Sequence, residues 1–133
     1  MRATAKLVPG TLQSDVLVRD RFRLLTDEPE SVGGDDTAQT PHELLAAALA
    51  ACISTTIGMY ARTKEWELGE VRVDVEYDKN ATPRHFRVDV HLDGDYDADQ
   101  IARLEAVAAA CPVRRSLEAG FAIEEHVHAS VLV

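Results

Sequence analysis

The chain has 133 residues, of which 46% are hydrophobic and 28% are charged, a balance typical of one globular domain and not of a disordered or collagen-like chain. The formal net charge is −9 and the basic residues are scattered, which argues against a nucleic-acid partner, because phosphate binding needs clustered Lys and Arg. The first residues lack the long apolar stretch of a secretory signal, so we expect a cytoplasmic protein among reduced thiols.

The first elements in chain order are predicted to be short strands. Residues 2–26 contain apolar runs that are broken by Pro9-Gly10 and other turn residues, as in an antiparallel hairpin or meander. Residues 27–39 are acidic and rich in Gly and Pro, without apolar periodicity, and therefore predict a loop that could cover a site.

A long helix is predicted next. Thr40 is a suitable N-cap, Pro41 suits the first helical position and Glu43 completes a capping box, so the helix should begin at Pro41 and end near Lys64. At 1.5 Å per residue it would be roughly 36 Å long, more than the roughly 30 Å width of a small domain. Its faces are mostly apolar, so it must be buried in protein or in lipid. The many Ala, Ser, Thr and Gly residues and the surrounding strand-like segments favour a core helix that a second subunit helps to cover.

The second half of the chain predicts a hairpin, two helices and a closing strand. Residues 71–77 and 86–92 alternate apolar with polar side chains, the period of half-buried strands. A helix is expected over 98–110, and the Cys-Pro pair after it should interrupt the helical geometry. A short helix over 112–119 and an alternating strand over 121–133 complete the prediction.

Cys111 precedes Pro112 and would therefore lie at the N-terminus of a helix. Free N–H groups and the helix dipole lower the pKa of a thiol in that position, and Arg114 and Arg115 add positive charge. The alternative is a small apolar residue that fills a helix junction. Local chemistry alone favours Cys111 as the more acidic thiol.

Cys52 has the opposite setting, in the middle of an Ala-rich helix, which predicts an inert buried thiol with a raised pKa. It would need a cation or a base from elsewhere in the fold to become a nucleophile. Arg19, Arg21 and Arg23 would project from one face of a strand, either into solvent or, for one of them, toward a cysteine. Glu43 already has a structural explanation in the capping box.

No metal or cofactor motif is present in the sequence. His126 and His128 would share one strand face and could bind zinc together with a cysteine, but the Cys-x-x-Cys and His-Glu-x-x-His spacings are missing. A Gly-rich phosphate loop and a Gly-x-Ser-x-Gly elbow are missing as well. The sequence therefore predicts no metal site and no cofactor.

Two segments resemble the motifs of the OsmC/Ohr family. Residues 40–52 are similar to the central-helix signature of that family, with the sequence TPHELLAAALAAC. Residues 111–114, Cys-Pro-Val-Arg, are similar to its second-cysteine motif. With the order of elements, the resemblance covers essentially the whole chain. It implies an α+β fold of antiparallel sheets packed on a long central helix, in an intertwined homodimer with two active sites near the interface.

The resemblance also implies a cysteine-based peroxidase that reduces organic hydroperoxides and is regenerated by a dithiol. By motif position Cys52 is the peroxidatic residue and Cys111 the resolving one, and we follow the family over the local prediction. In the hydroperoxide-resistance branch an Arg from the N-terminal strands and a Glu assist the peroxidatic thiol. Here His42 occupies the position of that Glu, with Glu43 after it, and residues 11–13 hold no Arg. Arg19 lies nearest to that register, so Arg19 and Glu43 complete the expected site.

Two other functions stay open at the level of sequence. The same dimer could be a non-catalytic module that holds a small molecule in an apolar interface pocket, with the cysteines as packing residues. Steady turnover of a hydroperoxide with a dithiol would separate this binding module from the peroxidase. An acyl-transfer or hydrolytic use of Cys52 is a third option, for which no Cys-His-Asp set can be placed.

Overall fold

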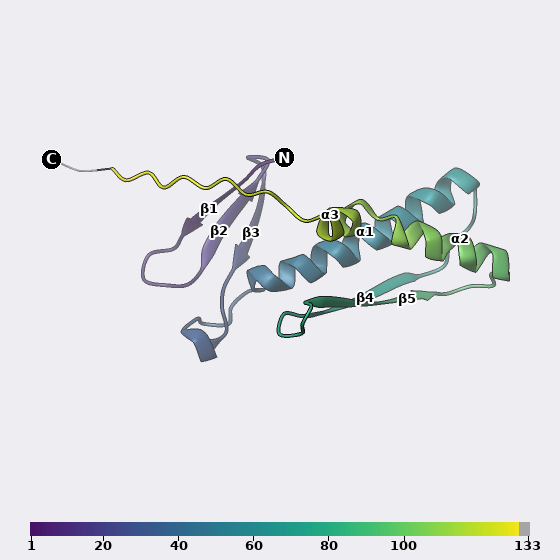
Figure 1. Cartoon of the computed structure of the whole chain (residues 1–133), viewed down its shortest axis with the longest axis horizontal. Helices are drawn as coiled ribbons and strands as arrows, with labels where there is room; N and C mark the ends of the chain where they lie inside the picture. The colour runs from purple at the N-terminus through teal and green to yellow at the C-terminus, as the bar shows by residue number, and fades with distance from the viewer. Residues whose placement is uncertain (131–133) are drawn as a thin grey trace.

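Two separate antiparallel sheets and three helices make up the computed structural model, which describes residues 1–130 (Figure 1). The N-terminal sheet is the expected meander, in which the middle strand pairs with both neighbours. Its strands are β1 (Ala3–Leu7), β2 (Ser14–Val18) and β3 (Phe22–Thr26). The chain turns between β2 and β3 through Arg19 and Asp20, which both have a positive φ.

The loop between the N-terminal sheet and the long helix is organised around a buried carboxylate. Asp27 is fully buried and accepts hydrogen bonds from the N–H of Glu28 (2.8 Å), the N–H of Thr37 (3.1 Å) and the hydroxyl of Thr37 (2.7 Å). Gly34 passes so close to the carbonyl of Glu28 that any Cβ there would clash. The loop, which includes the short 3₁₀ helix η1 (Glu30–Val32), therefore has a defined shape.

The long helix α1 (Pro41–Lys64) begins and ends as predicted. Its capping box is complete, because Thr40 Oγ1 accepts from the N–H of Glu43 (3.1 Å) and Glu43 Oε1 accepts from the N–H of Thr40 (3.0 Å). The buried side chains of α1 recur every four residues and thus form one stripe. They are Leu49, Ile53, Ile57 and Ala61.

The core lies around this buried stripe of α1. The strands β4 (Val71–Asp78) and β5 (His85–Leu92) pair as the predicted hairpin, and β4 packs on α1. The helices α2 (Ala98–Ala109) and α3 (Pro112–Ala119) also contact α1. Leu104 of α2 joins the stripe in the buried core.

The predicted closing strand is not formed by residues 121–130, and residues 131–133 lie outside the described part of the chain. Residues 121–130 run away from the helices as an extended segment (Figure 1). Its apolar side chains are largely exposed, at 69% for Phe121, 83% for Ile123 and 89% for Val127. A strand needs a neighbouring backbone to take its hydrogen bonds. The prediction is wrong for residues 121–130 of one chain because the described chain places no strand beside them.

One described helix, α1, is long and apolar enough to cross a membrane by length and composition, with a mean hydropathy of 1.8 over its most apolar window. Its packing against β4, α2 and α3 identifies it as a core helix. Even so, only 22% of that window is buried within one chain, and Met59 on its outer face is 64% exposed. An apolar face of this extent typically marks an interaction surface.

Candidate functional site

Cys52 lies near the middle of α1, beside the buried stripe, and its side chain is half-buried. Thr56, one turn further along, donates its hydroxyl proton to the carbonyl of Cys52 at 2.7 Å. The same hydroxyl oxygen lies 3.9 Å from Cys52 Sγ. The only polar side chain of α1 that approaches the thiol is therefore already engaged with the backbone.

Cys111 is the N-cap residue of α3 and is completely buried. The chain leaves α2 with the N–H of Cys111 bonded to the carbonyl of Ala108 (3.3 Å) and enters α3 with the carbonyl of Cys111 bonded to the N–H of Arg115 (3.0 Å). Pro112 occupies the first position of α3, where its missing N–H costs nothing. The predicted break between two helices thus places Cys111 in the core.

The first turn of α3 packs on α1, and this contact brings the two cysteines together as free thiols. Cys52 packs against the buried core cluster that includes Cys111, and the Cys111 side chain and the N–H of Val113 act to lower the pKa of Cys52. The backbone N–H groups of Val113 and Arg114 also approach the sulfur of Cys111. The two sulfurs therefore share the N-terminal end of α3.

This arrangement shifts the pKa values of the two thiols in opposite directions. Burial alone would raise the pKa of Cys52, but the hydrogen bonds from Cys111, Val113 and Thr56 outweigh it and lower the pKa below the ordinary value for a thiol. Burial raises the pKa of Cys111, and the hydrogen bond that Cys111 donates to Cys52 raises it further. The local prediction that Cys111 is the more acidic thiol is wrong, because burial and the hydrogen bond to Cys52 outweigh the N–H groups of Val113 and Arg114 that lower the pKa of Cys111.

The arginines of the N-terminal sheet are engaged elsewhere in the single chain. The guanidinium groups of Arg19 and Arg21 lie 5.7 and 5.1 Å from the centre of the Phe22 ring, and Arg23 forms an ion pair with Asp15. Within residues 1–130, no arginine is among the groups that act on the thiol of Cys52. One chain by itself does not bring Arg19 to the cysteine pair.

Glu43 and His42 lie in the first turn of α1, away from the groups that act on Cys52. The carboxylate of Glu43 is held in the capping box, where the N–H of Thr40 lowers its pKa. The ring of His42 lies 5.9 Å from the ring of Tyr77 on β4. As predicted, Glu43 has a structural role in the helix cap, and any chemical role would be additional.

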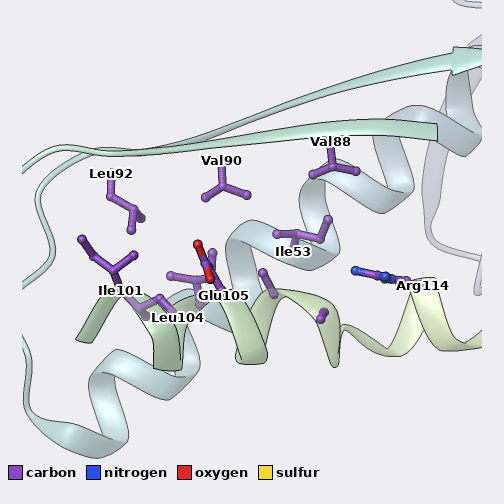
Figure 2. Close-up of a pocket in the computed structure, with 11 residues that line it drawn as sticks. Ile53, Val88, Val90, Leu92, Ile101, Leu104, Glu105 and Arg114 are labelled. Carbon is purple, nitrogen blue, oxygen red and sulfur yellow. The ribbon is translucent and has the colours of Figure 1, made fainter. Parts of the chain in front are cut away.

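A cavity of about 270 Å³ lies between α1, α2 and β5 (Figure 2). Its walls are mostly aliphatic, and Glu105 and Arg114 are the charged residues in its lining. Arg114 is also bonded to Glu118 at 2.6 Å. The aliphatic residues of the lining include Ile53 and Ile57 of α1, Val88, Val90 and Leu92 of β5, and Ile101 and Leu104 of α2.

Two features of the site were missed at the level of sequence. The N–H of Val113 is one of the unpaired donors that every helix N-terminus carries, so the signal was present in the Cys-Pro-Val segment, but its recipient on another helix could not be identified. The charged lining residue Glu105 gave no signal, since a Glu on an amphipathic helix normally faces solvent. Within residues 1–130 no three metal-ligating side chains gather, and His126 and His128 lie on the exposed segment with ring centres 6.5 Å apart.

A central helix, two separate antiparallel sheets and a cysteine pair at the contact of α1 with α3 define an α+β protein with a candidate dithiol redox site. The family model described as OsmC-like protein matches residues 33–126. The chain therefore belongs to the OsmC-like family, and the resemblance seen in the sequence is confirmed. No curated protein matches the chain.

Solved structures share this fold. A protein from Psychrobacter arcticus is 24% identical over 85% of each chain, with a TM-score of 0.69. A protein from Legionella pneumophila, described as an organic hydroperoxide resistance protein, is 25% identical over 86% of this chain and 88% of its own, with a TM-score of 0.60. The organic hydroperoxide resistance protein OhrB of Bacillus subtilis is 22% identical over 86% and 87%, with a TM-score of 0.55.

Proposed function

We propose that this protein is a thiol peroxidase that reduces organic hydroperoxides, with Cys52 as the peroxidatic residue and Cys111 as the resolving residue. The observation that carries the proposal is the pair of free thiols in contact at the junction of α1 and α3, with the pKa of Cys52 lowered and that of Cys111 raised. A peroxidatic cysteine must react as a thiolate. A resolving cysteine must lie close enough to form a disulfide with it.

The reaction follows from these positions. The thiolate of Cys52 attacks one oxygen of the hydroperoxide, so that an S–O bond forms, the O–O bond breaks and the alkoxide leaves as an alcohol after taking a proton. Cys52 is now a sulfenic acid, and the thiol of Cys111 condenses with it to give a disulfide and water. An external dithiol then reduces the disulfide to two thiols and is itself oxidised to a disulfide.

The aliphatic cavity supports organic over inorganic peroxides as substrates. Ile53, which follows Cys52 in α1, contributes to its wall, and neither cysteine is among the residues that line it. Burial of apolar surface favours an alkyl or aryl ligand by about 25 cal/mol per Å² removed from water. Hydrogen peroxide has no apolar group to bury and gains nothing from this cavity.

A homodimer is part of the proposal. The exposed apolar face of α1 and the exposed segment 121–130 are surfaces that one chain leaves uncovered, and a second copy would cover both. In such a dimer Arg19 of the partner subunit is our candidate for a cation near Cys52, with Glu43 beside it. The protein would act in the cytoplasm, where dithiols are available for its regeneration.

The test of the proposed function is turnover of cumene hydroperoxide with dithiothreitol as the reductant. Cys52→Ser should abolish peroxide consumption. Without dithiothreitol, Cys111→Ser should consume one equivalent and stop, with Cys52 trapped by dimedone as a sulfenic acid. The opposite pattern, with the first turnover lost in Cys111→Ser and kept in Cys52→Ser, would reverse the two roles.

The activating cation has its own test in the Cys111→Ser background. Replacing Arg19 with Met keeps much of the length and removes the charge, and it should raise the pKa of Cys52 and slow peroxide attack. Arg21→Met and Arg23→Met are the matched controls from the same strand region. If all three leave both quantities unchanged, the N-terminal sheet supplies no cation to the site.

The cavity also favours a second candidate, a non-catalytic dimer that binds a small apolar molecule. This binding module predicts no steady turnover of hydroperoxides by the wild-type protein. It predicts instead that an apolar carboxylic acid raises the melting temperature, and that Ile57→Ala, which changes the cavity wall, alters this effect.

A further inference from the structure

A second cavity adjoins the aliphatic one. It has a volume of about 370 Å³, and its lining comes from α1, α3 and the start of β5. Val88 and Arg114 line both cavities, so the two share part of their walls. Pockets for small organic ligands span roughly 300 to 1,000 Å³, and together the two cavities form one site of this order with an aliphatic part and a polar part.

The polar cavity has more cationic than anionic groups in its lining. Its titratable residues are Arg84, His85, Arg114 and Glu118. Within residues 1–130, Arg84 and His85 form no ion pair, and Arg114 and Glu118 pair with each other. The lining therefore has an excess of positive charge in a chain whose net charge is −9, which favours an anionic group in this cavity.

Arg114 keeps hydrogen-bond donors for such a group. A guanidinium has five N–H donors in a fixed fork, and in the described part of the chain Arg114 uses only Nε, which donates to Glu118 Oε1 at 2.6 Å. The two terminal Nη groups remain, and their geometry matches the two oxygens of a carboxylate. Figure 2 shows the Arg114 side chain reaching from α3 toward the end of the aliphatic cavity where Val88 lies.

Glu105 determines which way a charged ligand would lie. It lines the aliphatic cavity from α2, and in Figure 2 it projects toward Val90, away from the end with Arg114. A ligand anion is repelled by this carboxylate and attracted by the guanidinium. The anionic group is therefore favoured beside Arg114, and the apolar remainder of the ligand among the aliphatic side chains.

We infer that the two cavities form a binding site for an amphipathic carboxylate, with the alkyl chain in the aliphatic cavity and the carboxylate on Arg114. Neither cysteine lines either cavity, so this binding needs no thiol chemistry. The inference rests on the proposed function in one respect, since both use the aliphatic cavity for an organic group. It goes further by assigning the charge of the ligand and the residue that selects it.

Titration calorimetry of the reduced full-length protein tests the choice of ligand. Octanoate, octanol and octylamine have the same chain and differ in the head group, so octanoate should bind most tightly and octylamine least. Propionate has the carboxylate without most of the chain and should bind much more weakly than octanoate. No binding of octanoate, equal affinities for octanoate and octanol, or tighter binding of octylamine would overturn the inference.

Substitutions in the ion pair should change the affinity for octanoate in opposite directions. Arg114→Gln removes the guanidinium and should weaken binding about three- to tenfold, whereas Glu118→Gln removes the competing carboxylate and should tighten it. The affinity for octanol should stay nearly the same in both variants. Arg115→Gln is the matched control, because Arg115 lines neither cavity. Weaker octanoate binding in both variants would mean that the ion pair only shapes the cavity, and would overturn the inference.

The position of the chain has a separate test. Ile101 lines the aliphatic cavity and is 43% exposed, so Ile101→Gln makes the wall more polar without a new buried group. It should weaken the binding of octanoate and octanol alike, whereas Val32→Gln, outside both cavities, should change neither. Unchanged affinities in a folded Ile101→Gln protein, checked by its melting temperature, would place the chain elsewhere and overturn the inference.

These measurements contain no peroxide and are independent of turnover. A protein that prefers octanoate through Arg114 but never consumes cumene hydroperoxide supports the inference and refutes the peroxidase. A protein that turns over cumene hydroperoxide but binds octanoate no better than octanol supports the function and refutes the inference.

Discussion

Oxidation of the cysteine pair should stabilise the fold by an amount that can be worked out from the chain. A Cys52–Cys111 disulfide would close a loop of about 60 residues, which contains the second half of α1 and all of β4, β5 and α2. The chain-entropy relation gives about 4 kcal/mol for a loop of this length at 25 °C. Strain in the folded state reduces this figure, so we expect the oxidised protein to be more stable than the reduced one by about 2 to 4 kcal/mol.

The assay is urea unfolding of the protein before and after treatment with one equivalent of cumene hydroperoxide. Both forms are compared at the same protein concentration, because dissociation of a dimer also contributes to the apparent stability. Thiol titration of the unfolded protein and intact mass confirm one disulfide within each chain. Cys52→Ser and Cys111→Ser are matched controls and should gain no stability from the oxidant.

Several results would refute the reasoning behind this prediction. Oxidised protein that still has two free thiols per chain, or a disulfide that links two chains, would mean that the sulfurs do not meet as the junction of α1 and α3 indicates. A disulfide within the chain that lowers stability would mean that the pair cannot bond without distorting the core around Cys111.

Two further predictions concern the loop and the proposed dimer. Thr37 and backbone N–H groups lower the pKa of Asp27 from 3.8 to about 2, so the stabilisation by this carboxylate is present above about pH 4 and is lost as the pH falls through 2. Asp27→Asn should therefore lower the melting temperature at pH 7 and make the melting temperature fall less steeply in acid. A melting profile that Asp27→Asn leaves unchanged would contradict this prediction. Met59→Asp should shift the mass measured by light scattering toward that of one 14.6 kDa chain, whereas Val32→Asp, equally exposed at 62% but away from α1, should not.

The local elements were predictable because their signals act over a few residues. The capping box of Thr40 and Glu43 places the start of α1, and the alternation of β4 and β5 places the hairpin. Pro112 separates α2 from α3 through the loss of one N–H. Each of these effects depends on neighbours within four or five positions, which the sequence contains.

The closing strand shows the limit of such signals. Alternation over 121–133 indicates which side chains would share a face, but a strand exists only where another backbone supplies hydrogen bonds. That partner is a property of the assembled fold. The same holds for the exposed face of α1. Its apolar composition predicts that this face is buried against another surface, but it does not identify that surface.

The cysteine pair makes the same point about chemistry. The physical rule used for Cys111 was correct, since unpaired N–H groups at a helix start do stabilise a thiolate, but at Cys111 burial and the hydrogen bond to Cys52 outweigh that effect. Burial and donation to Cys52 keep Cys111 protonated, while the N–H of Val113 reaches across to α1. Helix position alone therefore ranks the two thiols in the wrong order. Only the packing of α3 on α1, which local sequence signals do not contain, decides how burial and hydrogen bonds shift the pKa of each sulfur.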